Sequence, residues 1–156
     1  MTFPEGIVSG LSDFSIAMWV NIDKQEIWAR LFDFGSGGGS FMFLAASSNG
    51  EHNMRFSING GSGEQHVNGS KPLPLGKWAH VAFVMKQGTG TLWLNGEEIG
   101  RNPGITITPK HLGKTTQNYI GKSQFPDPGL NGKIDDFRIY SSALSAGEIA
   151  VLARAR

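Results

Sequence analysis

The sequence predicts an all-β fold, an antiparallel two-sheet jelly-roll sandwich with a short C-terminal helix. The chain divides into about ten to twelve short segments of alternating apolar and polar residues separated by turn signals, which is typical of sandwiches. Its 22 glycines and seven prolines indicate many tight turns. The absence of repeated βα units and of internal repeats argues against α/β, propeller and solenoid folds. At 156 residues, the chain can bury the core of one domain.

The first half of the chain predicts five strands. In the segment Phe14 to Ile22 every second residue is apolar, so one face of this strand points into the core. In the next segment, Ile27 to Phe34, strict alternation places Trp28 and Arg30 on the same face as Phe32 and Phe34. Turns containing glycine connect the remaining three strands, which we place at 41–45, 54–58 and 64–67.

The second half predicts further strands and the helix. A proline-rich connection leads to a strand from Trp78 to Met85, and residues 91–100 form a hairpin about Asn95-Gly96, a pair favoured in type I′ turns. A long polar loop precedes a short strand at 118–121, and the last strand covers 132–140. Ser145 and Glu148 have the spacing of a capping box, which predicts that a helix starts there.

The last predicted strand carries a carboxylate on its apolar face. With strict alternation, Asp135 shares a face with Phe137 and Ile139, which we expect to point into the core. A buried carboxylate has to be hydrogen-bonded, paired or metal-bound, because burying it bare costs several kcal/mol. Asp135 is therefore a candidate ligand of a structural Ca²⁺. The alternative, that it accepts backbone hydrogen bonds at a strand crossover, is equally open.

The composition excludes several classes of partner. The net charge is +1 and only 17% of residues are charged, so nothing favours binding to nucleic acid or to an anionic membrane surface. No apolar run is long enough to span a bilayer. The absence of cysteine leaves the redox compartment undecided. Residues 1–6 lack the basic start and apolar segment of a signal peptide.

Four stretches, at 14–20, 76–82, 90–96 and 132–149, resemble the laminin-G-like, concanavalin-A-like jelly-roll domains appended to secreted carbohydrate-active enzymes. They occur in the family's order and cover nearly the whole chain. The resemblance implies that residues 1–156 are a single domain excised from a larger multidomain protein. It also implies an extracellular location and a role in polysaccharide degradation beside the catalytic domain of the same parent chain.

An active site is not expected. The glucanase branch of this fold carries an E-x-D-x-x-E run on one strand, and this chain has none. The adjacent acidic pairs Glu97-Glu98 and Asp135-Asp136 each point to opposite faces, whereas a retaining glycosidase needs two carboxylates about 5–5.5 Å apart. There is no cysteine nucleophile, G-x-S-x-G elbow or zinc-binding histidine spacing.

Sugar binding is the preferred interpretation. Saccharide sites combine an aromatic face, which covers the C–H patch of the ring, with planar polar side chains that bind hydroxyl groups. Trp28 and Arg30 offer such a pair, and a second polar cluster flanks Tyr119 and Phe125. The resemblance places ligands on strands of this kind or at their edge loops. The predicted ligand-binding residues are Trp28, Arg30, Gln117, Asn118, Lys122 and Asp127, and the predicted partner is a polysaccharide or oligosaccharide.

Alternatives stay open for these residues and for the domain. Trp28 could pack under a neighbouring loop, with Arg30 paired to Asp33 or Asp127, because buried aromatic residues are more often structural than ligand-binding. The domain as a whole could be a structural or protein-interaction spacer, or a cryptic glycosidase.

Overall fold

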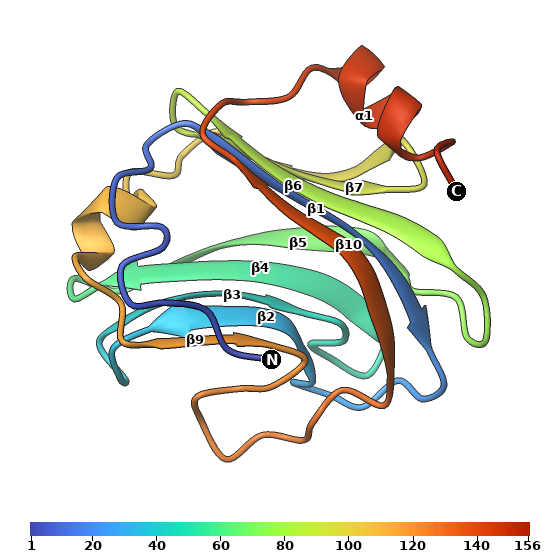
Figure 1. Cartoon of the computed structure of the whole chain (residues 1–156), viewed down its shortest axis with the longest axis horizontal. Helices are drawn as coiled ribbons and strands as arrows, with labels where there is room; N and C mark the ends of the chain where they lie inside the picture. Colours follow the sequence, from blue (N-terminus) through green and yellow to red (C-terminus); the bar gives the residue numbers. More distant parts are fainter.

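The computed structural model describes all residues, 1–156, and consists of two antiparallel five-stranded sheets packed face to face (Figure 1). Sheet I has the strand order β10-β1-β6-β7-β8, and sheet II has the order β5-β4-β3-β2-β9. The expected β-sandwich is confirmed. The strands are β1 (Phe14–Ile22), β2 (Arg30–Gly35), β3 (Ser40–Ala45), β4 (Asn53–Gly60), β5 (Glu64–Pro72), β6 (Ala79–Lys86), β7 (Thr89–Leu94), β8 (Glu97–Asn102), β9 (Gln117–Ile120) and β10 (Gly132–Tyr140).

The core lies between the sheets and contains 27 buried apolar residues. Every second residue of β1 from Phe14 to Ile22 belongs to it, as the alternation predicts. The two sheets contact each other where Phe56 of β4 stacks on Phe83 of β6, with ring centroids 3.6 Å apart. Because alternate residues of every strand point away from this core, each sheet keeps an outer face that is available for function.

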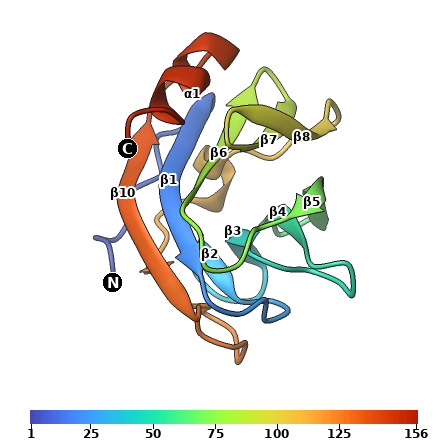
Figure 2. The same ribbon diagram turned by 90° about the vertical axis from the view of Figure 1, so that its right-hand side faces the viewer.

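Helix α1 (Ala146–Leu152) covers part of the outer face of sheet I (Figure 2). Ile149 is fully buried against Ala17, Ala82 and Val84. The predicted capping box is present, since the Ser145 hydroxyl accepts the N–H of Glu148 and the Glu148 carboxylate accepts the N–H of Ser145. No helix in the structure is long and apolar enough to cross a membrane.

The turns follow the local sequence. Asn95 and Gly96 connect β7 to β8 with φ angles of 51° and 81°, as the predicted type I′ turn requires. Within the long polar loop that follows β8, a 3₁₀ turn, η1 (Pro109–Leu112), buries Pro109 and Leu112. This turn was not predicted from the sequence.

A β-bulge in β2 makes the predicted faces of this strand wrong. Arg30 pairs with Ala45, but Phe32 pairs with Leu44, so the register shifts by one residue between them. Leu31 and Phe32 consequently both pack into the core, while Arg30 lies on the outer face of sheet II. The strand begins at Arg30, so Ile27 to Ala29 belong to the preceding turn.

A second bulge corrects the prediction for Asp135. Trp19 pairs with Asp135 and Ala17 with Arg138, so two residues of β10, Asp136 and Phe137, lie opposite the single residue Met18. Asp136 adopts a φ of 51° at this bulge. The side chains that pack on the core are therefore those of Ile134, Phe137 and Ile139, and Asp135 is exposed.

Candidate functional site

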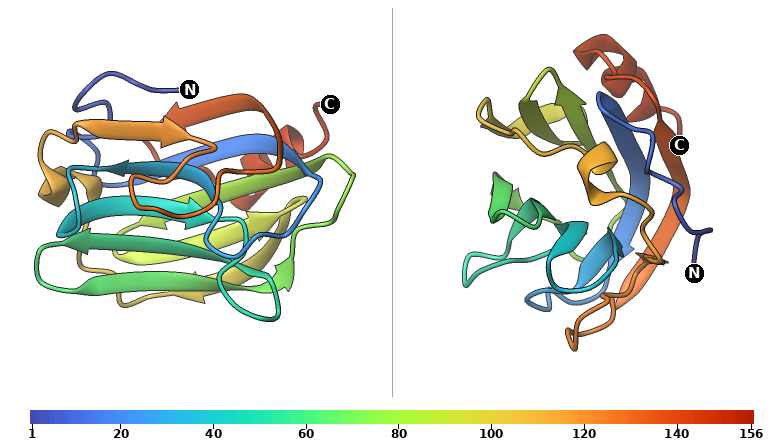
Figure 3. Two further views of the ribbon diagram at one scale, coloured as in Figure 1. Left: turned by 90° about the horizontal axis from the view of Figure 1, so that it is seen from below. Right: turned by 90° about the vertical axis from the view of Figure 1, so that its left-hand side faces the viewer.

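The strands of sheet II lie side by side, as the ribbon shows (Figure 3, left). Their outer face combines aromatic and polar side chains in rows that cross the sheet. These residues alternate with core residues such as Phe34, Met42 and Phe56, which is why they point outward. Two neighbouring rows follow from the strand register. One runs from β5 to β9 through Glu64, Asn59, Phe41, Gly35 and Gln117, and the next through His66, Ser57, Phe43, Asp33 and Tyr119.

An aromatic cluster occupies the middle of this face. Phe41 and Phe43 stack with centroids 5.5 Å apart, and both are nearly buried. Phe125, from the loop after β9, packs edge-on against Phe41, and Trp28, from the turn before β2, packs edge-on against Phe43. Phe125 and Trp28 are themselves only half-buried, so the outer layer of the cluster remains accessible.

Arg30 holds this part of the site together. Its guanidinium carbon lies 3.7 Å from the Phe43 ring centroid. Its nitrogens donate to Asp33 at 3.3 Å and to Asp127 at 3.0 Å, and also to the carbonyl oxygen of Trp28 at 2.7 Å. The side chain is only 4% exposed. Arg30 therefore fixes the turn that carries Trp28 and has few donors left for a ligand.

Asp33 is the buried partner in this network. Its carboxylate accepts hydrogen bonds from the side chain and backbone of Gln124 and from the Ser123 hydroxyl. Burial raises the pKa of Asp33, and these donors and Arg30 oppose that rise. Burial likewise lowers the pKa of Arg30, although a guanidinium stays protonated at any physiological pH.

The other end of the face is polar and more open. Arg55 of β4 donates to the Asn68 side chain at 2.7 Å, and its guanidinium carbon lies 5.7 Å from the Trp28 ring centroid. Arg55 is half-buried and Asn68 exposed. Beside them, Ser57 Oγ and His66 Nδ1 are buried without a hydrogen-bond partner. Trp28, Arg55 and Asn68 thus form an aromatic surface flanked by planar polar groups, which we call the Trp28 patch.

The structure brings together only part of the predicted ligand set. Trp28, Arg30 and Asp127 belong to one cluster. Lys122 lies further along the face, at the β9 edge, with its Nζ 4.7 Å from the Tyr119 ring centroid. Asn118 does not point to this face, since it is buried and its amide donates to the carbonyls of Pro4 and Thr115.

Gln117 lies away from the Trp28 patch. It is half-buried on β9, opposite Gly35, in the row that also contains Phe41. The prediction of one polar cluster around β9 is therefore wrong in its geometry, because consecutive residues of a strand point to opposite faces.

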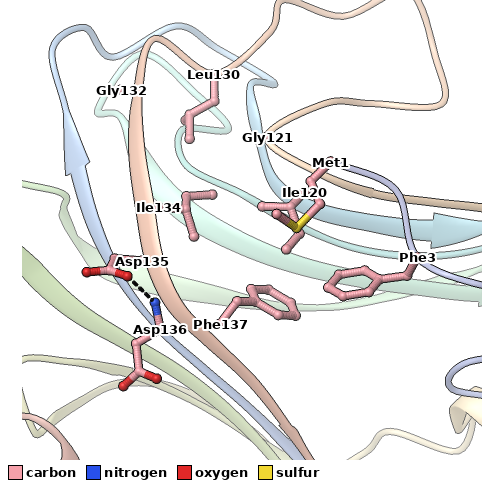
Figure 4. Close-up of a pocket in the computed structure, with 10 residues that line it drawn as sticks. All are labelled: Met1, Phe3, Ile120, Gly121, Leu130, Gly132, Ile134, Asp135, Asp136 and Phe137. Carbon is pink, nitrogen blue, oxygen red and sulfur yellow. Dashed lines mark hydrogen bonds between the residues drawn. The ribbon is translucent and has the colours of Figure 1, made fainter.

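Asp135 does not have the surroundings of a calcium ligand. Its carboxylate is 59% exposed and bonds to the Arg156 guanidinium at 2.8 Å and to the backbone N–H of Asp136 (Figure 4). These bonds lower the pKa of Asp135. No group of three or more histidine or acidic side chains that could hold a metal is present. The residues around Asp135 therefore do not fit an ion that takes six to eight oxygen ligands.

A largely apolar hollow of about 490 Å³ lies between the β9 and β10 edges. Figure 4 shows residues that line it, among them Phe3, Leu130 and Phe137. The N-terminal residues border it, since the Phe3 N–H donates to the Asn118 carbonyl and the Ile120 N–H donates to the Met1 carbonyl. Asp135 therefore lies at the rim of this hollow and not in the core.

A laminin G family model, described as the concanavalin A-like lectin/glucanases superfamily, matches residues 1–150. The chain belongs to this superfamily. The family resemblance predicted from four stretches of sequence is thereby confirmed. No curated protein matches the chain in sequence.

Several solved structures share this superfamily fold. Domain 4 of AbnA, a GH43 extracellular arabinanase from Geobacillus stearothermophilus solved in complex with arabinotriose, has a TM-score of 0.82 at 23% identity, over 97% of this chain and 71% of that chain. The CBM40 of the Ruminococcus gnavus IT-sialidase bound to α2,3 sialyllactose has a TM-score of 0.78 at 14% identity, over 98% and 95%. At these identities the likeness concerns the fold.

Two members of the Trp28 patch were not among the predicted ligand residues. Arg55 and Asn68 lie on strands whose alternation does show that they point outward, because Met54 and Phe56 face the core. Their proximity to Trp28 depends on the pairing of β3 with β4 and of β4 with β5, and no local pattern contains that information.

Proposed function

We propose that this chain is a non-catalytic carbohydrate-binding module that holds saccharide on the outer face of sheet II, at the Trp28 patch. The observation that carries the proposal is the half-exposed Trp28 ring, braced against Phe43 and flanked by Arg55 and Asn68. An aromatic face covers the apolar side of a sugar ring, and the guanidinium and amide groups offer donors and acceptors for its hydroxyl groups.

Hydrogen bonds hold the backbone of Trp28 in place. Its φ of 69° is unusual for a residue with a side chain, but its N–H donates to the Ser47 carbonyl and its own carbonyl accepts from Arg30. A ring held in place before the ligand arrives loses little conformational entropy on binding. In this proposal Arg30 and Asp127 position the binding residues and do not contact the ligand.

The carboxylates of this face support binding without cleavage. Asp33 and Asp127 both interact with Arg30 and with Ser123, so they lie close together. The Asp33 side chain is fully buried, and both carboxylates are ion-paired to the guanidinium of Arg30. A glycosidase needs one carboxylate at the anomeric carbon and another at the leaving oxygen, and a sugar cannot reach Asp33 in this position.

The wider role proposed is to keep a secreted parent enzyme near its polysaccharide. Domain 4 of an extracellular arabinanase and the CBM40 of a sialidase are parts of larger enzymes, and both support this context. The partners are then a polysaccharide or oligosaccharide and the catalytic domain of the same parent chain. Calcium has no part in this proposal.

The test is saccharide binding measured by affinity electrophoresis and calorimetry. The panel contains arabinan, xylan, β-glucan and fructan, together with arabinotriose and sialyllactose. We expect at least one of these to bind. Trp28→Ala and Arg55→Ala should each weaken that binding about tenfold, which corresponds to 1.4 kcal/mol. The matched control is Trp78→Ala, which removes a half-buried tryptophan that lies at the start of β6 in sheet I.

Each alternative function has its own outcome. If no saccharide of the panel is retained, the proposal fails and a spacer role is favoured. If the purified domain hydrolyses aryl glycosides, the Asp33–Asp127 pair becomes a candidate active site and the module is catalytic. If Trp28→Ala lowers the melting temperature and Trp78→Ala weakens binding equally, Trp28 is a structural residue and the site lies elsewhere.

A further inference from the structure

A second hollow lies on the outer face of the opposite sheet, beside helix α1. Its volume is about 520 Å³, and it is lined by residues of β6, β7 and β8 and by the segment 144–146 that leads into the helix. The strand register explains the lining, because Val84 pairs with Thr91 and Thr91 with Arg101 across the outer face of sheet I. This surface is separate from the Trp28 patch, since the two sheets and the core lie between them.

Trp93 is the aromatic wall of this hollow. It is half-buried, because one part of the ring packs against the apolar cluster under α1. Its indole N–H donates to the Thr91 hydroxyl at 2.9 Å, so the orientation of the ring is fixed. The remaining part of the ring borders the hollow together with Thr89 and Gln87. An oriented aromatic ring beside hydroxyl and amide groups is an arrangement that suits a sugar.

The charges in the lining all have the same sign. Lys86 and Arg101 contribute two cations, and no acidic residue lines the hollow. Lys86 is exposed and takes part in none of the ion pairs of the structure. An unpaired ammonium group in a hollow has three donors to offer to an anion.

The carboxylates around the hollow already have partners. Glu98 bonds to Arg101 at 2.7 Å, Asp13 accepts the backbone N–H of Gln87 at 2.9 Å, and Glu148 accepts the N–H of Ser145 in the helix cap. None of them binds Lys86. Lys86 is therefore the only cation of the hollow without a carboxylate partner; it pairs with Thr89 and lines the same hollow as Trp93.

We infer that this hollow is a second saccharide site, and that it takes a carboxylate-bearing sugar unit such as a uronic acid. The sugar ring lies against Trp93, its hydroxyl groups bond to Thr89 and Gln87, and its carboxylate bonds to Lys86, with Arg101 adding positive charge. A charge-assisted hydrogen bond of this kind discriminates an acid from its ester far better than a contact between neutral groups does. The chain then has one surface on each sheet for a polysaccharide of mixed composition.

The test uses the indole N–H signals of the protein in ¹H–¹⁵N spectra. The chain has four tryptophans, so Trp93 and Trp28 report separately on the hollow and on the Trp28 patch. The probes are galacturonate and glucuronate trisaccharides, each compared with its methyl ester, which has the same ring and no charge. We expect the acids to shift the Trp93 signal at concentrations where the esters do not, and to leave the Trp28 signal unchanged.

Two variants of matched chemistry complete the experiment. Lys86→Gln should weaken binding of the acid at least about tenfold, because one charge-assisted hydrogen bond is lost. Lys77→Gln should leave binding of the acid unchanged. Lys77 is also exposed, but it lies just before the start of β6, whereas Lys86 lies at the end of this strand. Equal binding of acid and ester, a shift confined to tryptophans other than Trp93, no binding of any acid, or full affinity in Lys86→Gln would each overturn the inference. The Trp28 signal tests the proposed function independently.

Discussion

Replacement of Arg30 by methionine tests whether this residue supports the site or binds the ligand. Arg30 and Asp33 are 4% and 0% exposed in their side chains, so the substitution leaves a carboxylate buried without its cation. Breaking a buried pair from one side costs about 3–5 kcal/mol. The total stability of a domain is about 5–15 kcal/mol, so we expect Arg30→Met to lose a large part of it.

The pH dependence of this loss follows from Asp33. Burial already raises the pKa of Asp33, and removal of Arg30 raises it further. An acid with a raised pKa in the folded state contributes stability below its unfolded pKa and loses it as the pH rises through the folded pKa. The destabilisation by Arg30→Met should therefore be smaller in mildly acidic buffer than at neutral pH. The double variant Arg30→Met/Asp33→Asn should recover most of the loss, because the fully buried carboxylate is gone, while Asp127 is 24% exposed and keeps the hydrogen bond from the Ser123 hydroxyl.

The assay is urea unfolding followed by tryptophan fluorescence. With a slope of roughly 2–3 kcal/mol per molar urea, a loss of about 3–5 kcal/mol lowers the midpoint by about 1–2.5 M. The control is Lys71→Met, which breaks an ion pair of 2.7 Å with Glu97 that is 51% and 64% exposed. Such exposed pairs contribute about 0–1 kcal/mol. Equal midpoints for the two variants, or loss of saccharide binding without loss of stability in Arg30→Met, would refute a supporting role.

Two further predictions concern the outer face of sheet I. Burial lowers the pKa of His80, and its Nδ1 has no hydrogen-bond partner, so the folded state resists protonation. Stability should therefore be full above the ordinary pKa of about 6.5 and fall as the pH drops from there toward the lower folded pKa. In His80→Gln the urea midpoint should vary less between pH 5 and 8. If the midpoint of this variant changes with pH as much as that of the original protein, His80 is not the group responsible. Because Asp135 is exposed and paired with Arg156, millimolar calcium and a chelator should give the same melting temperature. A lower melting temperature in the chelator would show that an ion is bound.

Much of the fold could be predicted because it is encoded locally. Alternation over Phe14–Ile22 identifies a strand and its buried face, since side chains of a strand point alternately to its two sides. The Asn95-Gly96 turn and the Ser145–Glu148 cap depend only on neighbouring residues, and both were predicted correctly. The family resemblance extended this local information to the whole sandwich.

The faces of two strands depended on the pairing of distant segments. A bulge changes which side a residue faces, and it is visible only when the partner strand is known. The bulge in β10 turns Asp135 outward, although the sequence alone predicts a buried carboxylate. The bulge in β2 separates Arg30 from the core residue Phe32 in the same way.

What the sequence determined by itself is the set of strands, the class of fold and the core residues of strands without a bulge, such as β1, because each follows from periodicity within a short segment. Tertiary structure alone decided the composition of the candidate sites. Trp28 meets Arg55, and Arg55 meets Asn68, through the register of β3, β4 and β5. Lys86, Trp93 and Arg101 line one hollow through the register of β6, β7 and β8. Strand register is fixed by how whole faces pack against the core, so it is a property of the assembled sheets and not of any one segment.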